Sequence, residues 1–409
     1  MSQTTFVDVS NTVNQPYTTG IQRVVREIGR VALRRGALLV EFSSTSGEWH
    51  LVDPGDLYQS RLGTKGRSRT LRARELYHLA IRSTGSHGAA RLALRQMPAN
   101  AERARRLLAG RRARFGNKVE VGGAHLVLPE ITSSVRHAET LRDLSTQGRL
   151  RLSCFVHDLF SLTNPEWFRY DPRHHFPQYL EAVGASSRIS VASEFVRNQL
   201  QSAGVAVDSK IFRLPAGRML PIDQAGSLTP PETFLLSVGS LEPRKNHVGL
   251  LEAVTQLAQG GLRIRLVIVS QLRSGPPGLD TVVKRARAGG VGVTILHDVD
   301  DAQLGRLYSR ATCTVYPSFA EGYGLPVVES LAYGTPVITS NTSALREFAD
   351  LGGVLLVEPG NVDALATAIR EVLDPGAQRV LAAGIQADRV PVGWEPWAER
   401  LLAWSTDGD

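Results

Sequence analysis

The sequence has little of what marks secreted or membrane-spanning proteins. Only two of the 409 residues are cysteines. Because Cys154 and Cys313 both lie inside apolar runs, we expect buried free thiols rather than a disulfide. No run of about 18 consecutive apolar residues occurs, which excludes a membrane-spanning helix. The N-terminal residues, MSQTT, lack the basic start and apolar run of a secretory signal. These absences predict a soluble protein of the reducing cytoplasm.

The composition excludes several unusual classes of protein chain. Hydrophobic residues make up 42% of the sequence and charged residues 21%, which is ordinary for a globular protein. Disordered, collagen-like and disulfide-scaffold proteins are therefore excluded. At about 150 residues per domain, the length predicts two or three domains.

The positive charge is concentrated in one segment, residues 61–118. It holds sixteen Lys and Arg but only two acidic residues, Glu75 and Glu102, so its net charge is +14 and the rest of the chain carries −6. Leucines and alanines recur in it at helical spacing. Since basic amphipathic helices bind anionic lipid surfaces, one interpretation is peripheral binding to a membrane. The alternative is a solvated, arginine-rich helical face; nucleic acid fits less well, because few aromatic residues are present for stacking.

Two series of strand and helix patterns predict two α/β domains. The first spans residues 1–217 and the second 233–385, with a linker at 218–232, and the Trp-rich stretch 386–409 predicts a last helix that packs back on the first domain. The expected architecture is two doubly wound sheets that face each other across a cleft, with ligands at the carboxyl ends of the strands. The expected strands are 5–10, 37–42, 125–129, 152–157, 189–192, 233–239, 265–270, 292–296, 312–316, 336–339 and 354–357.

The segment EGYGLPVVE, residues 321–329, places a glycine-containing loop before a short helix. Gly322 and Gly324 let the backbone approach a ligand closely, and the N–H groups of a helix start favour a phosphate. A helix terminus contributes only about 0.3–2 kcal/mol, so cations must help to hold a diphosphate. The alternative makes Glu321 a solvated loop acid and Glu329 a capping partner.

Such cations are present in SVGSLEPRKNH, residues 237–247. A buried strand is expected to end at Gly239, and the following turn presents Arg244 and Lys245 ahead of the next helix. Guanidinium and ammonium groups at the carboxyl end of a strand match a diphosphate in shape and charge. Alternatively, the two residues form a surface charge pair at a helix start.

Other polar groups favour structural roles. His157 precedes Asp158 at the end of an expected strand, where a histidine is either a core residue or part of a site. His174 and His175 fit the surface better than a metal site. The acidic run 298–301 directly precedes a helical stretch, so N-capping explains it better than metal binding. No Cys and His residues have the spacing of a zinc site, and we expect a protein without a metal ion.

In combination, EGYGLPVVE and the preceding VGSLEPRKN resemble the retaining glycosyltransferases of family 4, which are group 1 glycosyltransferases of GT-B fold. Further similar segments are TTGIQRV at 18–24, VHDLF at 156–160 and SEFVRNQL at 193–200. One departure is the Thr-Gly pair at 19–20, where many relatives have Gly-Gly. The resemblance implies two Rossmann-like domains, the first for the acceptor and the second for a nucleotide sugar.

The resemblance also implies a role for each matching residue. Arg244 and Lys245 would hold the donor diphosphate and stabilise the departing nucleotide, as a divalent ion does elsewhere. Glu321 would contact hydroxyls of the transferred sugar, Glu329 would hold the ribose, and His157 would lie beside the sugar. The other members of the implied nucleotide-sugar site are Gly20, Gly239, Gly322, Tyr323, Gly324 and Leu325.

The implied reaction moves a hexose or deoxyhexose, with retention of anomeric configuration, to a sugar hydroxyl of a growing bacterial surface polysaccharide such as an O-antigen, or of a lipid-linked oligosaccharide. The donor is a nucleotide-diphosphate sugar, with GDP-mannose, GDP-fucose or dTDP-rhamnose as candidates, and neither cofactor nor metal is expected. Residues 61–118 would hold the enzyme on the inner face of the cell membrane. Two alternatives stay open: a soluble small-molecule acceptor, and a non-catalytic relative that binds a polyanion or a membrane.

Overall fold

The computed structural model of the protein describes most of the two predicted α/β series. The described residues are 4–15, 19–58, 116–168, 171–205, 208–217, 233–271 and 275–406. The basic segment predicted at 61–118 lies outside them except for its last three residues, and the linker predicted at 218–232 lies outside them entirely. None of the helices in the described part of the chain is long and apolar enough to cross a bilayer.

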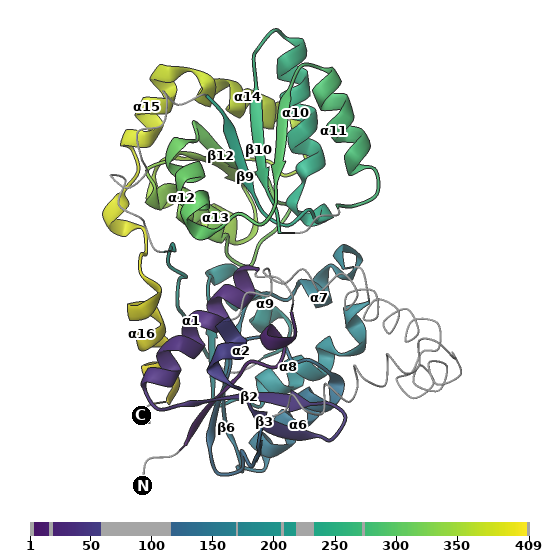
Figure 1. Ribbon diagram of the computed structural model, residues 1–409, viewed down its shortest axis with the longest axis vertical. Coiled ribbons are helices and arrows are strands. Elements are labelled where there is room, and N and C mark those ends of the chain that lie inside the picture. The colour runs from purple at the N-terminus through teal and green to yellow at the C-terminus, as the bar shows by residue number, and fades with distance from the viewer. Residues whose placement is uncertain are drawn as a thin grey trace, which may run out of the picture.

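Two sheets, each with helices packed against it, lie one beyond the other along the long axis of the molecule (Figure 1). Within the described residues the first sheet has the strand order β4-β3-β2-β1-β5-β6-β7-β8. Its strands are parallel except for β3, which pairs antiparallel with both β2 and β4. The strands are β1 (Thr5–Asp8), β2 (Leu38–Ser43), β3 (Glu48–Leu51), β4 (Lys118–Val119), β5 (His125–Leu128), β6 (Arg151–Val156), β7 (Arg188–Val191) and β8 (Ser209–Ile211).

Helices cover this sheet where the chain crosses from one parallel strand to the next. They are α1 (Gly20–Arg34), α2 (Pro54–Tyr58), α6 (Val135–Thr146), α7 (Phe160–Thr163), α8 (Phe176–Gly184) and α9 (Glu194–Ser202), with short 3₁₀ turns η1 (Thr12–Asn14), η2 (Pro165–Trp167) and η3 (Pro172–His174). The strand order reverses between β1 and β5, and in such sheets ligands bind beyond the carboxyl ends of the strands at this reversal.

The second sheet is parallel, with the order β11-β10-β9-β12-β13-β14 among the described residues. Its strands are β9 (Leu235–Val238), β10 (Arg265–Val269), β11 (Gly292–Leu296), β12 (Cys313–Tyr316), β13 (Val337–Ser340) and β14 (Val354–Val357). Its helices are α10 (His247–Gln259), α11 (Leu279–Ala288), α12 (Asp301–Arg310), α13 (Leu325–Ala332), α14 (Val362–Leu373) and α15 (Pro375–Ala383), with η5 (Pro243–Lys245), η6 (Ser343–Leu351) and η7 (Ala387–Arg389). The order reverses between β9 and β12, the strands that precede the two motifs singled out in the sequence.

Local sequence explains several of the element boundaries. Ser193 caps α9, accepting a hydrogen bond from Val196 N at 3.2 Å. Asp300 caps α12 in the same way through Gln303 N at 2.7 Å, so the capping role expected for the acidic run 298–301 is confirmed. Both cysteines are free and buried, as the apolar runs around them indicate.

The last helix, α16 (Trp394–Thr406), packs against α1 of the first sheet's layer, as Figure 1 shows in yellow and purple. Its Glu395 pairs with Arg34 at 2.6 Å. Trp397 is almost fully buried, and its indole Nε1 donates to Phe212 O at 3.3 Å. The chain therefore crosses to the second domain and returns to end on the first.

A fully buried carboxylate anchors the start of the first sheet. Asp8 accepts hydrogen bonds from Trp49 Nε1 and His137 Nε2, each at 3.0 Å, and from Ser10 N at 3.0 Å. Burial alone would raise the pKa of Asp8, but His137 and the hydrogen bonds outweigh it and lower that pKa below its usual value of 3.8. The network joins β1, β3 and α6.

We expect Asp8→Asn to reduce the free energy of unfolding at pH 7 by about 2–3 kcal/mol, because hydrogen bonds to a buried charge are lost. The lowered pKa of Asp8 means that its contribution is present above 3.8 and disappears as the pH falls through the folded value. Urea denaturation of wild type and variant at pH 7 and pH 3 measures this. A difference between the two proteins that is as large at pH 3 as at pH 7 would contradict it.

Candidate active site between the two domains

The carboxyl ends of β9 and β12 bring two cations and one carboxylate into direct contact. Arg244 Nη1 donates to Glu321 Oε2 at 2.5 Å, and Lys245 Nζ donates to Glu321 Oε1 at 2.7 Å. Tyr316, the last residue of β12, donates its hydroxyl to Glu321 Oε1 at 2.8 Å. Ser343 Oγ accepts from the backbone N–H of Glu321 at 2.9 Å, so the side chain and the backbone of Glu321 are both held.

Arg244 also lies 3.6 Å from a second, more exposed carboxylate, that of Glu242. Burial would raise the pKa of Glu321, but Arg244 and Lys245 outweigh it and bring that pKa down to about 2. Burial, reinforced by the charge of Arg244, lowers the pKa of Lys245 against the opposing effect of Glu321. The pKa of Arg244 is raised, because Glu321 and its neighbours outweigh burial. Guanidinium and ammonium groups placed together in this way can bind an anionic ligand.

The glycine loop between Glu321 and α13 lies directly against the first domain. A methyl group on Gly322 would collide with the carbonyl oxygen of His157, and Ser193 Oγ donates to Gly322 O at 2.7 Å. Gly324 has φ +124° just before α13, a conformation that side chains other than glycine rarely adopt. The loop needs its glycines for this close approach and for the turn into the helix.

Glu329, one turn into α13, is bound by one side chain from each domain. Arg23 of α1 donates from Nη1 to Glu329 Oε1 at 2.7 Å, and Tyr308 donates its hydroxyl to Glu329 Oε2 at 3.0 Å. Burial raises the pKa of Glu329, while Arg23 and Tyr308 oppose that rise. Arg23 also pairs with Asp301 at 3.2 Å.

His157 lies at the end of β6 with its ring buried. Its Nε2 contacts Pro129 O at 2.8 Å, and since a carbonyl oxygen only accepts, Nε2 carries the proton. Burial lowers the pKa of His157 to about 4, so the ring is neutral at pH 7. Nδ1 is then a hydrogen-bond acceptor, which suits a sugar hydroxyl.

Comparison with known proteins relates the second domain to a known family. The sequence model of the family Glycosyl transferases group 1 matches residues 222–382. O-antigen chain mannosyltransferase B of Escherichia coli is 31% identical over 247 residues, which cover 55% of this chain and 62% of that protein. D-inositol 3-phosphate glycosyltransferase 1 of Catenulispora acidiphila is 31% identical over 253 residues, covering 54% and 59%. The chain thus matches about three fifths of the length of these relatives.

Solved structures match along nearly the whole chain. Sucrose-phosphate synthase from Thermosynechococcus elongatus has a TM-score of 0.64 at 19% identity, over 98% of both chains. Anabaena HepE in complex with UDP-glucose has a TM-score of 0.63 at 13% identity, over 98% of this chain and 100% of that one. The chain has the GT-B fold. The fold class expected from the sequence is therefore confirmed.

The GT-B arrangement brings the expected site residues into two groups. Arg244, Lys245 and Glu321 touch one another, and Gly239 lies against the aliphatic part of Lys245. Glu329 belongs to a second group, where Arg23 and Tyr308 hold it. Between the groups lie the glycine loop and the start of α13.

Two of the expected residues connect the GT-B domains through particular atoms. A methyl group on Gly20, at the start of α1, would lie 3.3 Å from Leu325 Cδ1, so α1 and α13 begin against each other. Tyr323 donates its hydroxyl to Leu214 O of the first domain at 2.7 Å. The side chain of Tyr323 is thereby committed to the contact between domains, which leaves its backbone for a ligand.

Sequence reasoning missed Arg23, Tyr308 and Tyr316. Arg23 lies in the TTGIQRV segment already noted for its glycine, and a cation three residues after that glycine was the available signal. The two tyrosines have no such signal, because a buried Tyr in a strand or on the core side of a helix is ordinary. Among the described residues, no three His, Cys, Asp or Glu side chains are grouped as a metal site would require.

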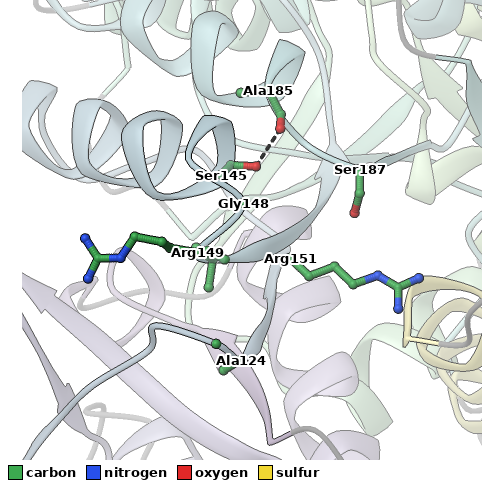
Figure 2. A pocket seen from close by; sticks show the side chains of 9 residues that line it. Ala124, Ser145, Gly148, Arg149, Arg151, Ala185 and Ser187 are labelled. Atoms are coloured by element: carbon green, nitrogen blue, oxygen red, sulfur yellow. Dashed lines mark hydrogen bonds between the residues drawn. The ribbon is translucent and has the colours of Figure 1, made fainter.

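A cavity of about 310 Å³ lies elsewhere, at the edge where β5, β6 and β7 begin. Figure 2 shows that the side chains of Arg149 and Arg151 point away from each other there, and that Ser145 donates to Ala185 O (2.5 Å). The two guanidinium groups do not converge on one ligand. This cavity is at the opposite end of the strands from the Glu321 cluster.

We expect Gly322→Ala to keep the two GT-B domains apart, because the added methyl group would collide with the carbonyl oxygen of His157. The radius of gyration measured by small-angle X-ray scattering should rise, and the free energy of unfolding should fall by about 1–3 kcal/mol. Gly184→Ala is the control, because no atom lies within 4 Å of its added methyl group. Scattering curves that coincide for wild type and Gly322→Ala would disprove the expectation.

Proposed function

We propose that this chain is a retaining, metal-independent glycosyltransferase. It would move a hexose or deoxyhexose from a nucleotide-diphosphate sugar to a sugar hydroxyl of a growing bacterial surface polysaccharide or a lipid-linked oligosaccharide. The observation that carries the proposal is that Arg244 and Lys245, two largely buried cations, meet Glu321 at the strand reversal of the second sheet. The relatives support it, since two of them are named mannosyltransferase and glycosyltransferase.

In this proposal the donor diphosphate lies against Arg244, Lys245 and the N–H groups at the start of α13. These groups stabilise the negative charge that grows as the bond between the anomeric carbon and the phosphate oxygen breaks. Glu321 binds hydroxyls of the transferred sugar, and Glu329 binds the ribose. The proposed cations are already fixed by hydrogen bonds, so little reorganisation is needed when the charge develops.

Retention follows if the acceptor hydroxyl enters on the face from which the diphosphate leaves. A phosphate oxygen of the leaving group then takes the acceptor's proton, and Nδ1 of His157 accepts a hydrogen bond from the sugar. Glu321 is a poor covalent nucleophile, because both of its oxygens are bound and its pKa is about 2. Positioning and electrostatic stabilisation are therefore proposed as the source of the rate enhancement.

The similarity to O-antigen chain mannosyltransferase B favours GDP-mannose as the donor, ahead of GDP-fucose and dTDP-rhamnose. The similarity to D-inositol 3-phosphate glycosyltransferase 1 favours a second candidate, transfer to a small soluble acceptor. Attachment to the inner face of the membrane through residues 61–118 stays a prediction. Flotation with anionic and neutral liposomes tests it, and equal binding to both contradicts it.

We expect Lys245→Ala and Glu329→Ala each to lower kcat/KM at least tenfold, about 1.4 kcal/mol of transition-state stabilisation. Lys245→Ala removes a cation from the diphosphate, and Glu329→Ala removes the ribose contact. Steady-state transfer kinetics measure both, with Lys284→Ala on the exposed side of α11 as the matched control. Unchanged kinetics in either site variant refute the role proposed for that residue.

A panel of GDP, UDP, ADP and dTDP should identify the donor's base. The nucleotide that fits raises the melting temperature, because it binds the folded chain and not the unfolded one. If Arg244 and Lys245 replace a divalent ion, this shift and the transfer rate persist in excess EDTA. Transfer that requires added magnesium would contradict the metal-independent mechanism.

A further inference from the structure

Helices α1 and α13 come from different domains, and their first turns meet at one ion pair. Arg23 lies one turn into α1, and its guanidinium contacts Glu329 Oε1 at 2.7 Å. The two side chains are 21% and 8% exposed, so the pair is shielded from solvent. Beside it, Gly20 packs against Leu325 at the start of α13.

The charged and polar groups that act on Glu329 come from α1 and α12. Tyr308 of α12 donates a neutral hydroxyl to Glu329 Oε2 at 3.0 Å. Asp301, also of α12, is an anion that opposes ionisation of Glu329, while Arg23 is the cation that supports it. A methyl group on Gly217 would lie 2.8 Å from Arg23 Nη2, so the guanidinium occupies a narrow slot between the domains.

We propose that Arg23 is a positioning residue of the donor site: it reaches across the domain interface and holds Glu329 as an oriented carboxylate, so that the ribose-binding residue is complete only when the first domain is closed on the second. This inference rests on the proposed function, in which Glu329 binds the ribose of the nucleotide.

The physical reason is the cost of a buried charge without a partner. If Arg23 is withdrawn, Glu329 keeps one neutral hydrogen-bond donor and faces Asp301. Protonation of Glu329 then becomes favourable. In a protonated carboxyl group one oxygen carries the proton and donates a hydrogen bond, so the group can no longer accept hydrogen bonds from two ribose hydroxyls through its two oxygens. Closure of the first domain on the second and binding of the nucleotide are thereby coupled through the side chain of Arg23.

The test is the affinity for the nucleoside diphosphate that binds best among GDP, UDP, ADP and dTDP, measured by calorimetry from pH 6 to pH 9. Arg23→Met removes the charge and keeps an unbranched side chain. We expect its Kd to be about tenfold higher than that of wild type at pH 7 (about 1.4 kcal/mol). The ratio of the two Kd values should shrink as the pH rises and Glu329 ionises in the variant. Arg23→Lys should restore most of the affinity.

Arg34→Met is the matched control, because Arg34 lies on the same helix and pairs with Glu395 of α16, away from the site. Its Kd should equal that of wild type at every pH. A Kd for Arg23→Met that equals or falls below the wild-type value overturns the inference, and so does a ratio that does not change with pH. In either case nucleotide binding by wild type leaves the proposed function standing.

A thermal-unfolding cycle without nucleotide gives an independent measurement. Glu329→Gln in the Arg23→Met background should recover part of the melting temperature lost in Arg23→Met, because the unpaired carboxylate is removed. If the decreases in melting temperature of the two single variants simply add in the double variant, the coupling between Arg23 and Glu329 is contradicted. If wild type binds none of the four nucleotides, the proposed function falls and this role of Arg23 falls with it.

Discussion

The contact of Arg244 and Lys245 with the carboxylate of Glu321, in a region from which the chain largely excludes water, is the interaction on which the candidate site depends. Arg244 and Lys245 are costly to bury; Glu321 pairs with both of them, and the more exposed Glu242 lies 3.6 Å from Arg244. The reversal of strand order between β9 and β12 places all three groups at one edge of the sheet, and Tyr316 and Ser343 hold Glu321 in place. In the proposed function, the donor diphosphate is the ligand of this arrangement.

The loop that carries Glu321 and the helix α13 that follows it also contact the first domain. Ser193 binds the carbonyl of Gly322, Leu214 accepts from Tyr323, and Arg23 binds Glu329. On the other side of the loop, the carboxylate of Glu347 accepts from Phe195 N at 2.9 Å at the start of α9. A ligand bound to this loop is therefore in contact with groups whose positions depend on how the domains meet.

Much of the fold follows from local sequence, because apolar runs and turn residues locate the parallel strands and the reversal rule locates the site. Arg244, Lys245 and Glu321 are predictable as neighbours, since each follows a strand at that reversal. The pairing of Arg23 with Glu329 spans 306 residues and two domains, and nothing in periodicity specifies how two domains face each other. The Asp8 network was not predicted for a similar reason: a polar residue in a buried strand reveals its partners only in three dimensions. For residues 61–118 the sequence pattern remains the basis of the interpretation.

The return of α16 to the first domain makes that domain discontinuous in sequence. The chain passes between the domains twice, and the two passages run side by side where Ala216 N donates to Pro391 O at 2.8 Å. Two adjacent connections between the domains restrict the motion of one domain relative to the other mainly to rotation about the line that joins the connections. They oppose translation of one domain along the other. They also bear on modular evolution: an exchange of the second domain between proteins of this fold must splice at two junctions, or else Trp397 loses its buried position in the first domain.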